Sequence, residues 1–440
     1  MVSFEKRISS KVLIIGAGFS GLATACQLRR EHNCDDYVIY DRSSSPGGTW
    51  MCRGYPGGLL QSIFCPKPRL LESLPPQAEI LEYFNKVADK YDVSRRIVRN
   101  TEWEGAYWQD QTSSWLVKLK DLTTGQTFYH DCKILISAVG ALVNPNRFDV
   151  PGVEDFEGDI VHTAAWKEDM SLRQKDVIVV GNGCSAAQLI PAIAEEARSI
   201  TQFIRRRIFD NNKYISCLQA TNIHLTDDPI VKISTHSIFT KSGQEYPADA
   251  ILLATGFALT QYDVELVGRD GRTRSQHWDN FGYKEAYKST AMSGFPNFFY
   301  VLGPNSGKGH TSAIYSIENY VNLVMKVIAP VIQDRCSFVE VKPDSEKDYN
   351  VNLHEKIAAT IFNSSCGSYF IDYKTEKNWF IYPWNSFVMW YSTHWSNLDD
   401  WIYDVRPDKN RQVFCFGHLL LLLVSIISLG LTIIVKERYN

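Results

Sequence analysis

The chain has 440 residues, of which 45% are hydrophobic and 22% are charged, and its formal net charge is -3. This length and composition exclude a disordered or fibrous protein and allow two or three globular units. The balanced charge argues against a general nucleic-acid binder, which needs an excess of Lys and Arg facing phosphates. The ten cysteines include no C-x-x-C pair, so the sequence predicts no disulfide framework, no metal site and no paired-dithiol redox centre.

The N-terminal part contains a glycine fingerprint. The apolar residues 12–15 predict a buried strand that runs into Gly16-Ala17-Gly18-Phe19-Ser20-Gly21. In such a turn glycine lets the backbone approach a pyrophosphate, whose charge then rests on the N-terminus of the next helix. A second predicted strand at residues 38–40 ends on Asp41, twenty residues past Gly21, where a carboxylate can bind a ribose diol. We therefore predict an FAD site that includes Gly16, Gly18, Gly21 and Asp41.

A second fingerprint follows the apolar residues 177–180 and reads Gly181-Asn182-Gly183-Cys184-Ser185-Ala186. Its next predicted strand, residues 200–204, ends without an acid and continues into Arg205-Arg206-Arg207. Guanidinium groups at this place can neutralise a ribose 2′-phosphate. This pattern predicts an NADPH site in which Gly181, Asn182, Gly183, Ser185 and Ala186 hold the pyrophosphate and Arg205 and Arg206 hold the 2′-phosphate. The alternative for the arginines is a solvated run of charge.

The order of these elements predicts an α/β fold with two dinucleotide-binding, Rossmann-like domains. Residues 1–143 form the N-terminal part of the FAD domain, and residues 174–256 form a shortened NADPH domain. The linker at residues 144–173 contains Pro145, Pro151 and Gly152 and is expected to be irregular. Residues 257–405 complete the FAD domain and supply the substrate region, with a strand at 298–303 and a helix at 314–327.

The C-terminal part contains a long uncharged segment at residues 412–435, between basic residues on both sides. As a helix it is about 35 Å long, enough to cross a hydrocarbon core of about 30 Å. We therefore predict a single C-terminal transmembrane helix as part of the fold. The alternative is a core helix at the end of the globular domain. NADPH use and reduced thiols then imply a cytosolic catalytic domain on a membrane, with the endoplasmic reticulum as the expected site.

A third motif lies between the two fingerprints. Residues 156–166 have the spacing F-x-G-x-x-x-H-x-x-x-W, with His162 and Trp166 at its last two fixed positions. This motif resembles the signature of class B flavin-dependent monooxygenases of the Baeyer–Villiger type. With both fingerprints, Gly47-Gly48-Thr49-Trp50 and residues 249–256, the resemblance covers most of residues 11–400. The chain is most similar to fungal FAD-binding monooxygenases of secondary metabolism.

The resemblance implies a reaction and roles for residues. In that family NADPH reduces FAD, molecular oxygen is activated, and one oxygen atom is inserted beside a ketone carbonyl to give an ester or lactone. It implies an apolar, polyketide- or terpenoid-like ketone as substrate. It also implies that Gly48, Thr49 and Trp50 lie against the flavin and that His162 and Trp166 belong to a linker that rearranges as NADP moves. By the same matching, Arg207 is the catalytic cation.

The chain also departs from the family pattern. Relatives carry a helical insertion between the phosphate-binding arginine and the catalytic arginine, whereas Arg205 and Arg207 are almost adjacent here. The segment after Gly57 is shortened, and no Asp or Glu lies between Arg53 and Glu72 to pair with the catalytic arginine. Two alternatives therefore stay open: an N- or S-oxygenating flavin monooxygenase, and a cofactor-binding pseudoenzyme or truncated gene product. Trp166 favours the Baeyer–Villiger reaction, because heteroatom oxygenases usually carry tyrosine at that position.

Overall fold

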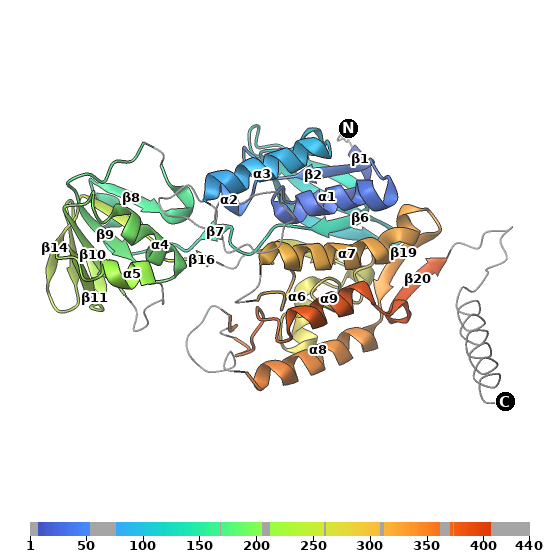
Figure 1. Cartoon of the computed structure of the whole chain (residues 1–440). Coiled ribbons are helices and arrows are strands. Elements are labelled where there is room, and N and C mark those ends of the chain that lie inside the picture. Colours follow the sequence, from blue (N-terminus) through green and yellow to red (C-terminus); the bar gives the residue numbers. More distant parts are fainter. Residues whose placement is uncertain are drawn as a thin grey trace, which may run out of the picture. The chain divides into compact units, whose positions relative to one another are not determined.

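The computed structural model describes residues 8–52, 76–167, 169–204, 212–258, 261–308, 312–360, 370–372 and 374–405 (Figure 1). The first lobe is built on an eight-stranded sheet with the order β17-β4-β5-β6-β1-β2-β3, in which β18 also pairs with β6. Its strands are β1 (Ile8–Ile15), β2 (Tyr37–Tyr40), β3 (Ile97–Val98), β4 (Thr101–Gln109), β5 (Ser114–Asp121), β6 (Thr127–Ser137), β17 (Glu265–Val267) and β18 (Phe298–Tyr300). Strands β1, β2, β3 and the carboxyl half of β6 run parallel, and β4, β5 and the amino half of β6 form an antiparallel meander.

The first lobe also contains the helices α1 (Phe19–His32), α2 (Thr49–Cys52), α3 (Gln77–Lys90), α6 (Arg274–Phe281), α7 (Ala313–Ile332), α8 (Pro343–Ala358) and α9 (Ser386–His394), and the paired strands β19 (Cys336–Val341) and β20 (Trp401–Val405). Figure 1 shows α1 and α7 side by side against the sheet. The two helices are joined by a hydrogen bond from Gln27 Nε2 to Asn322 Oδ1, 3.1 Å, and by one between the His32 ring and the Met325 carbonyl, 3.1 Å.

Strand β1 shows why this sheet has a core on both faces. Alternate side chains of a strand point to opposite faces, and Val12 and Ile14 are buried among α1 and α7. Leu13 and Ile15 are buried in the other cluster, which is rich in Trp, Tyr and Phe side chains. Burial on both faces accounts for the uninterrupted apolar run that the sequence shows at residues 12–15.

The second lobe is built on a parallel sheet with the order β11-β10-β9-β15-β8. These strands are β8 (Asp159–His162), β9 (Asp176–Val180), β10 (Ser199–Phe203), β11 (Ile223–Thr226) and β15 (Ala250–Leu253), and the helices are α4 (Cys184–Ile193) and α5 (Asn212–Cys217). A separate antiparallel sheet contains β12 (Ile230–Ile233), β13 (Ser237–Thr240) and β14 (Glu245–Pro247). It packs through Ile233 and Ile238 against the face of the parallel sheet opposite to α4 and α5. The chain passes between the lobes through β7 (Asn144–Pro145), which pairs with β16 (Phe257–Ala258).

The segment that contains the F-x-G-x-x-x-H-x-x-x-W motif is more regular than predicted. Residues 159–162 form β8, which pairs in parallel with β15 and so belongs to the second sheet. Short 3-10 turns at Val153–Asp155 and Thr163–Ala165 flank it. The expectation of an irregular linker was wrong here because pairing at a sheet edge depends on a partner about ninety residues away in sequence, as the Asp159 to Ala250 register shows.

The predicted fold class requires a correction at its C-terminal end. None of the helices that the structure describes is long and apolar enough to cross a membrane, and the predicted transmembrane segment, residues 412–435, lies outside the described residues. The longest described helix, α7, carries Glu318 and Lys326 and packs its apolar face into the core of the first lobe. Within the described residues the fold is therefore a two-lobed α/β architecture, and it includes no helix that could span a membrane.

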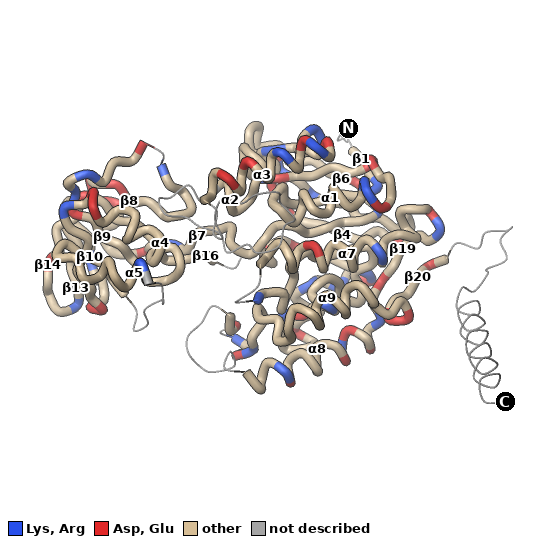
Figure 2. Tube along the Cα trace, in the orientation of Figure 1, with Lys and Arg blue, Asp and Glu red and all other residues tan. Residues whose placement is uncertain are grey.

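Charged residues of both signs are interspersed over the described chain (Figure 2). Arg198 is an example: its Nη2 lies 2.6 Å from Asp176 Oδ2 and 3.1 Å from Asp249 Oδ2. Asp176 begins β9 and Asp249 precedes β15, so this ion-pair cluster joins the amino ends of the two central strands. The fingerprint of the second lobe follows the opposite, carboxyl end of β9.

Candidate dinucleotide-binding sites

The first fingerprint connects β1 to α1, and two of its glycines are required by the fold itself. Gly16 has φ +107°, and a Cβ there would lie 2.4 Å from the carbonyl oxygen of Ala138. A Cβ at Gly21 would lie 2.0 Å from the carbonyl oxygen of Gly16. Side chains at these positions would therefore force β1, β6 and α1 apart.

The middle glycine, Gly18, has a different environment. Its φ is -86°, and an added Cβ would make only an ordinary contact, 3.5 Å from Gly48 Cα. The protein alone would thus accept a side chain here. Gly18 is the N-cap of α1, provides no side-chain cap, and is followed by no acidic residue in the first turn. The open space and the uncapped positive end of the helix suit a pyrophosphate.

Asp41 lies next to this turn. Its Oδ2 accepts a hydrogen bond from Ala17 N at 2.6 Å, and its Oδ1 accepts one from Ser43 N at 2.7 Å. Each carboxylate oxygen has a second lone pair with which it can accept a ribose hydroxyl. The structure therefore brings Asp41 to the fingerprint, as the sequence predicts.

The Gly47-Gly48-Thr49-Trp50 motif also lies against the fingerprint. Gly47 N donates to the Ala17 carbonyl at 2.9 Å. Gly48 has φ +57°, and a Cβ there would lie 2.9 Å from Gly18 Cα. Thr49 and Trp50 open the short helix α2 and are half-buried. The backbones of the two glycine motifs are thus in close contact.

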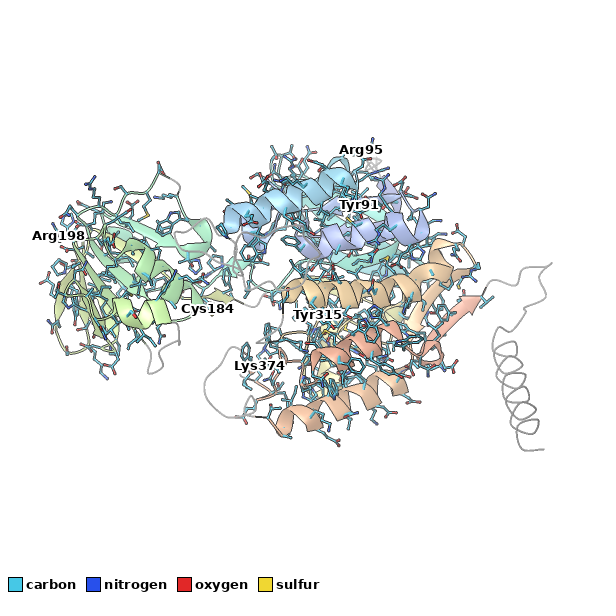
Figure 3. All side chains as sticks on the ribbon, in the orientation of Figure 1. Tyr91, Arg95, Cys184, Arg198, Tyr315 and Lys374 are labelled. Atoms are coloured by element: carbon cyan, nitrogen blue, oxygen red, sulfur yellow. The ribbon has the colours of Figure 1, made fainter. Side chains whose placement is uncertain are left out.

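The second fingerprint repeats this arrangement between β9 and α4. Gly181 has φ +113°, and its Cβ would lie 2.4 Å from the Ala254 carbonyl oxygen, whereas a Cβ at Gly183 would meet nothing within 4 Å. Gly183 is the uncapped N-cap of α4, and the exposed Cys184 that begins this helix is labelled in Figure 3. Asn182 and Ser185 are half-buried at the turn and the start of α4, and Ala186 lies on the buried face of α4.

A glutamine that sequence reasoning missed supports this second turn. The buried Gln202 of β10 donates from Nε2 to the Gly181 carbonyl at 2.9 Å and accepts at Oε1 from Tyr214 OH at 2.6 Å. It fixes the turn from the neighbouring strand, and an amide inside an apolar strand is the signal that could have pointed to it. Arg205, Arg206 and Arg207 lie outside the described residues, so their assigned roles stay predictions.

His162 links the signature motif to the end of β15. Its Nδ1 accepts a hydrogen bond from Ala164 N at 3.1 Å, so Nε2 carries the proton and donates to the Gly256 carbonyl, also at 3.1 Å. The same carbonyl accepts from Asn146 N at 3.0 Å. Trp166 packs partly buried against the core of the second lobe. His162 therefore ties β8 to the passage between the lobes, whereas Trp166 packs within the second lobe.

A lysine outside every predicted motif lies in the loop after β18. Lys308 Nζ donates to Ser386 Oγ at 3.1 Å and lies 5.2 Å from the centroid of the Tyr382 ring. Burial lowers the pKa of Lys308 to about 8. In the sequence, Lys308 could have been noticed as the single lysine of the glycine-containing stretch at residues 303–309.

We expect Lys308→Met to raise the free energy of unfolding most at neutral pH. The pKa of Lys308 in the folded state is below that of an ordinary lysine, so the burial penalty on the charged form is fully present below pH 8 and is relieved as pH rises from about 8 toward 10.5. Chemical denaturation of both proteins at pH 7 and pH 9.5 measures this. The advantage of Lys308→Met should shrink at the higher pH, and a difference that does not depend on pH would contradict the assignment.

Comparison with known proteins identifies the family of the chain. A family model described as "Pyridine nucleotide-disulphide oxidoreductase" matches residues 10–263, more than half of the chain, and includes both fingerprints. A Baeyer–Villiger monooxygenase of Pseudomonas aeruginosa is 26% identical, over 85% of this chain and 87% of its own length. An FAD-binding monooxygenase of Aspergillus niger is 25% identical, over 88% of this chain and 80% of its own length.

Solved structures show the same fold. Cyclohexanone monooxygenase from Rhodococcus sp. Phi1 bound to NADP+ matches with a TM-score of 0.81 and 22% identity, covering 91% of this chain and 100% of that chain. A steroid monooxygenase bound to NADP matches with a TM-score of 0.81 and 22% identity, covering 90% of this chain and 100% of that chain. The predicted resemblance is confirmed, and so, at the level of these homologues, are the predicted enzyme class and cofactors.

Proposed function

The chain belongs to the pyridine nucleotide-disulphide oxidoreductase family, and we propose that it is an NADPH- and FAD-dependent monooxygenase that converts an apolar ketone into an ester or lactone. The pair of fingerprints is the observation that supports this proposal most strongly. In each of them the fold would tolerate a Cβ at the middle glycine, and the absence of a side chain there leaves room for a pyrophosphate. Relatives named Baeyer–Villiger monooxygenases align over 85% of the chain. Cyclohexanone and steroid monooxygenases among the solved structures support an apolar cyclic ketone as the substrate class.

The residues present fit both cofactors. In the first lobe, Gly18 and the N-terminus of α1 would hold the FAD pyrophosphate, and Asp41 would accept hydrogen bonds from its ribose. In the second lobe, Gly183 and the N-terminus of α4 would hold the pyrophosphate of NADPH. Bound FAD would supply the hydride acceptor and the activation of molecular oxygen. A cytosolic location of the catalytic domain stays a prediction.

The test is oxygen transfer by the purified full chain loaded with FAD. With NADPH, ¹⁸O₂ and a panel of cyclic and steroidal ketones, we expect an ester or lactone that carries one ¹⁸O atom, detected by mass spectrometry. Binding of both cofactors without any oxygenated product from any ketone would support a pseudoenzyme instead. Oxygenation only of amines or sulfides would support the heteroatom-oxygenating alternative.

We expect Arg205→Ala to weaken binding of NADPH more than binding of NADH. Loss of one charge-assisted contact with the 2′-phosphate should cost about 1–3 kcal/mol, whereas NADH has no such phosphate. Flavin reduction rates measured at varied concentrations of each cofactor give the two affinities. Arg198→Ala is the matched control, because Arg198 binds Asp176 and Asp249 at the amino ends of the strands. Equal losses for NADPH and NADH would make Arg205 a structural residue.

A further inference from the structure

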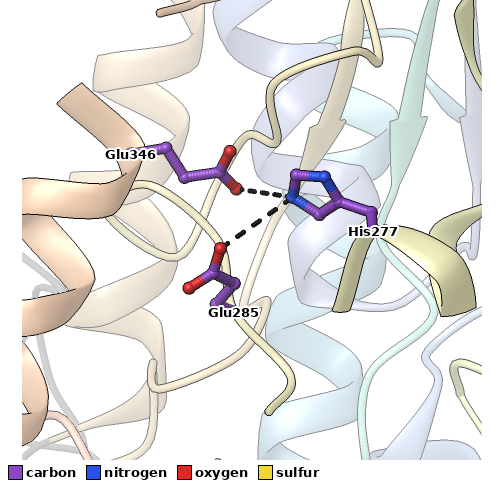
Figure 4. A group of neighbouring side chains, drawn as sticks. All are labelled: His277, Glu285 and Glu346. Carbon is purple, nitrogen blue, oxygen red and sulfur yellow. Dashed lines mark hydrogen bonds and ion pairs between the residues drawn. The ribbon is translucent and has the colours of Figure 1, made fainter. Parts of the chain in front are cut away.

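A buried cluster of polar residues in the first lobe belongs to neither dinucleotide site. It consists of His277 on α6, Glu285 in the loop that follows α6, and Glu346 on α8 (Figure 4). The side chains are 1%, 0% and 0% exposed, respectively. Burial of two carboxyl groups and an imidazole is costly unless the groups are paired or bind an ion.

The contacts within the cluster leave one carboxyl group without a partner. His277 Nε2 lies 3.1 Å from Glu346 Oε1, and Glu346 Oε2 accepts a hydrogen bond from Ser293 N at 2.8 Å. Glu285 Oε1 faces the same nitrogen at 4.0 Å, but neither oxygen of Glu285 has a hydrogen-bond partner. Within the described part of the chain, no Lys or Arg forms an ion pair with Glu285 or Glu346.

Two buried carboxyl groups share one imidazole in this cluster, so a bound cation would stabilise both of them. A proton on Glu285 would neutralise one carboxylate. A divalent cation would neutralise both and would also give the unpartnered oxygens of Glu285 a ligand.

We propose that His277, Glu285 and Glu346 form a binding site for a divalent transition-metal ion of the Zn²⁺ type. The three ligand atoms lie within 4.8 Å of one another. The separations of 3.1 and 4.0 Å bracket the ~3.3 Å expected between ligands of a tetrahedral ion with bonds of about 2.0–2.1 Å. His277 presents Nε2 to both carboxyl groups. One imidazole with two carboxylates suits Zn²⁺ better than Ca²⁺ or Mg²⁺.

The burial of the cluster assigns the ion a structural role. Side chains that are at most 1% exposed offer no open face to a substrate. The ion would instead tie α6 and the loop after it to α8, and its binding would stabilise the folded state by mass action. Release of the ion should therefore lower the melting temperature without changing how tightly the protein holds FAD.

The experiment uses the full chain with bound FAD, first freed of metal by a chelator and then titrated with Zn²⁺. We expect one equivalent of Zn²⁺ per chain, a higher melting temperature, and a Zn K-edge absorption spectrum with nitrogen and oxygen ligands only. Glu285→Gln should lower Zn²⁺ affinity by more than the ~10–100-fold that loss of an outer-shell partner costs. Glu340→Gln is the matched control: Glu340 is also buried, but it binds Gly294 N and Arg269, so Zn²⁺ affinity should not change.

Three results would overturn the proposal. The first is no retained Zn²⁺ at stoichiometric concentration. The second is sulfur in the coordination shell, which would assign the ion to cysteines. This measurement uses the unmodified protein, so it does not depend on the folding of a variant. The third is equal Zn²⁺ affinity in Glu285→Gln and Glu340→Gln. In each of these cases the cluster holds a proton and no metal.

Discussion

Gly18→Val is expected to give a folded protein that does not retain FAD. A Cβ at this position would meet only Gly48 Cα at 3.5 Å, so the free protein can place a side chain there. The branched side chain would occupy the space where a pyrophosphate must approach the backbone. Overpacking of this kind costs about 1–3 kcal/mol or more, which is about a 5- to 150-fold loss of affinity or more. The flavin absorbance per chain, measured after gel filtration, checks the result.

The other glycines of the fingerprint provide the contrast. Gly21→Val should destabilise the fold itself, because a Cβ there would lie 2.0 Å from the Gly16 carbonyl oxygen. Gly18→Ala should melt like the wild-type protein when both are free of FAD. If Gly18→Val keeps its flavin, or if Gly18→Val and Gly21→Val both fail to fold, the space beside Gly18 is not the pyrophosphate site.

The sequence predicts these turns well because the signal is local. A buried parallel strand, a glycine that must take a positive φ and a following helix occupy about twenty consecutive residues, and Gly16 and Gly181 take φ of +107° and +113° as that pattern requires. The strand at residues 200–204 and the helix at residues 314–327 were predicted for the same reason, and the structure has β10 and α7 there.

Features that depend on distant partners could not be predicted in this way. Strand β8 exists because β15 offers it an edge, and the cluster of His277, Glu285 and Glu346 forms only when α6 and α8 pack together. Gln202 supports Gly181 from a neighbouring strand. The transmembrane prediction used one local property, apolar length, and its segment, residues 412–435, lies outside the described residues.

The prediction with the largest effect on catalysis concerns Arg207. If it is the cation near the reacting oxygen, Arg207→Ala should leave FAD binding and reduction by NADPH nearly unchanged. Product formation should fall by about 10²–10³-fold or more, because a fixed cation acts where negative charge develops during oxygen transfer. Arg207→Lys should restore little, since a point charge on a flexible stem does not reproduce the planar guanidinium group. Single-turnover measurements separate flavin reduction from product formation.

Two neighbouring arginines make this test specific. On an extended strand Arg205 and Arg207 would point to one face and Arg206 to the other, so the three replacements should differ. Arg205→Ala and Arg206→Ala should affect NADPH affinity, and only Arg207→Ala should block oxygen transfer after the flavin is reduced. If Arg207→Ala impairs NADPH binding and leaves ester formation unchanged, Arg207 binds the phosphate, and the catalytic cation must be sought elsewhere in the chain.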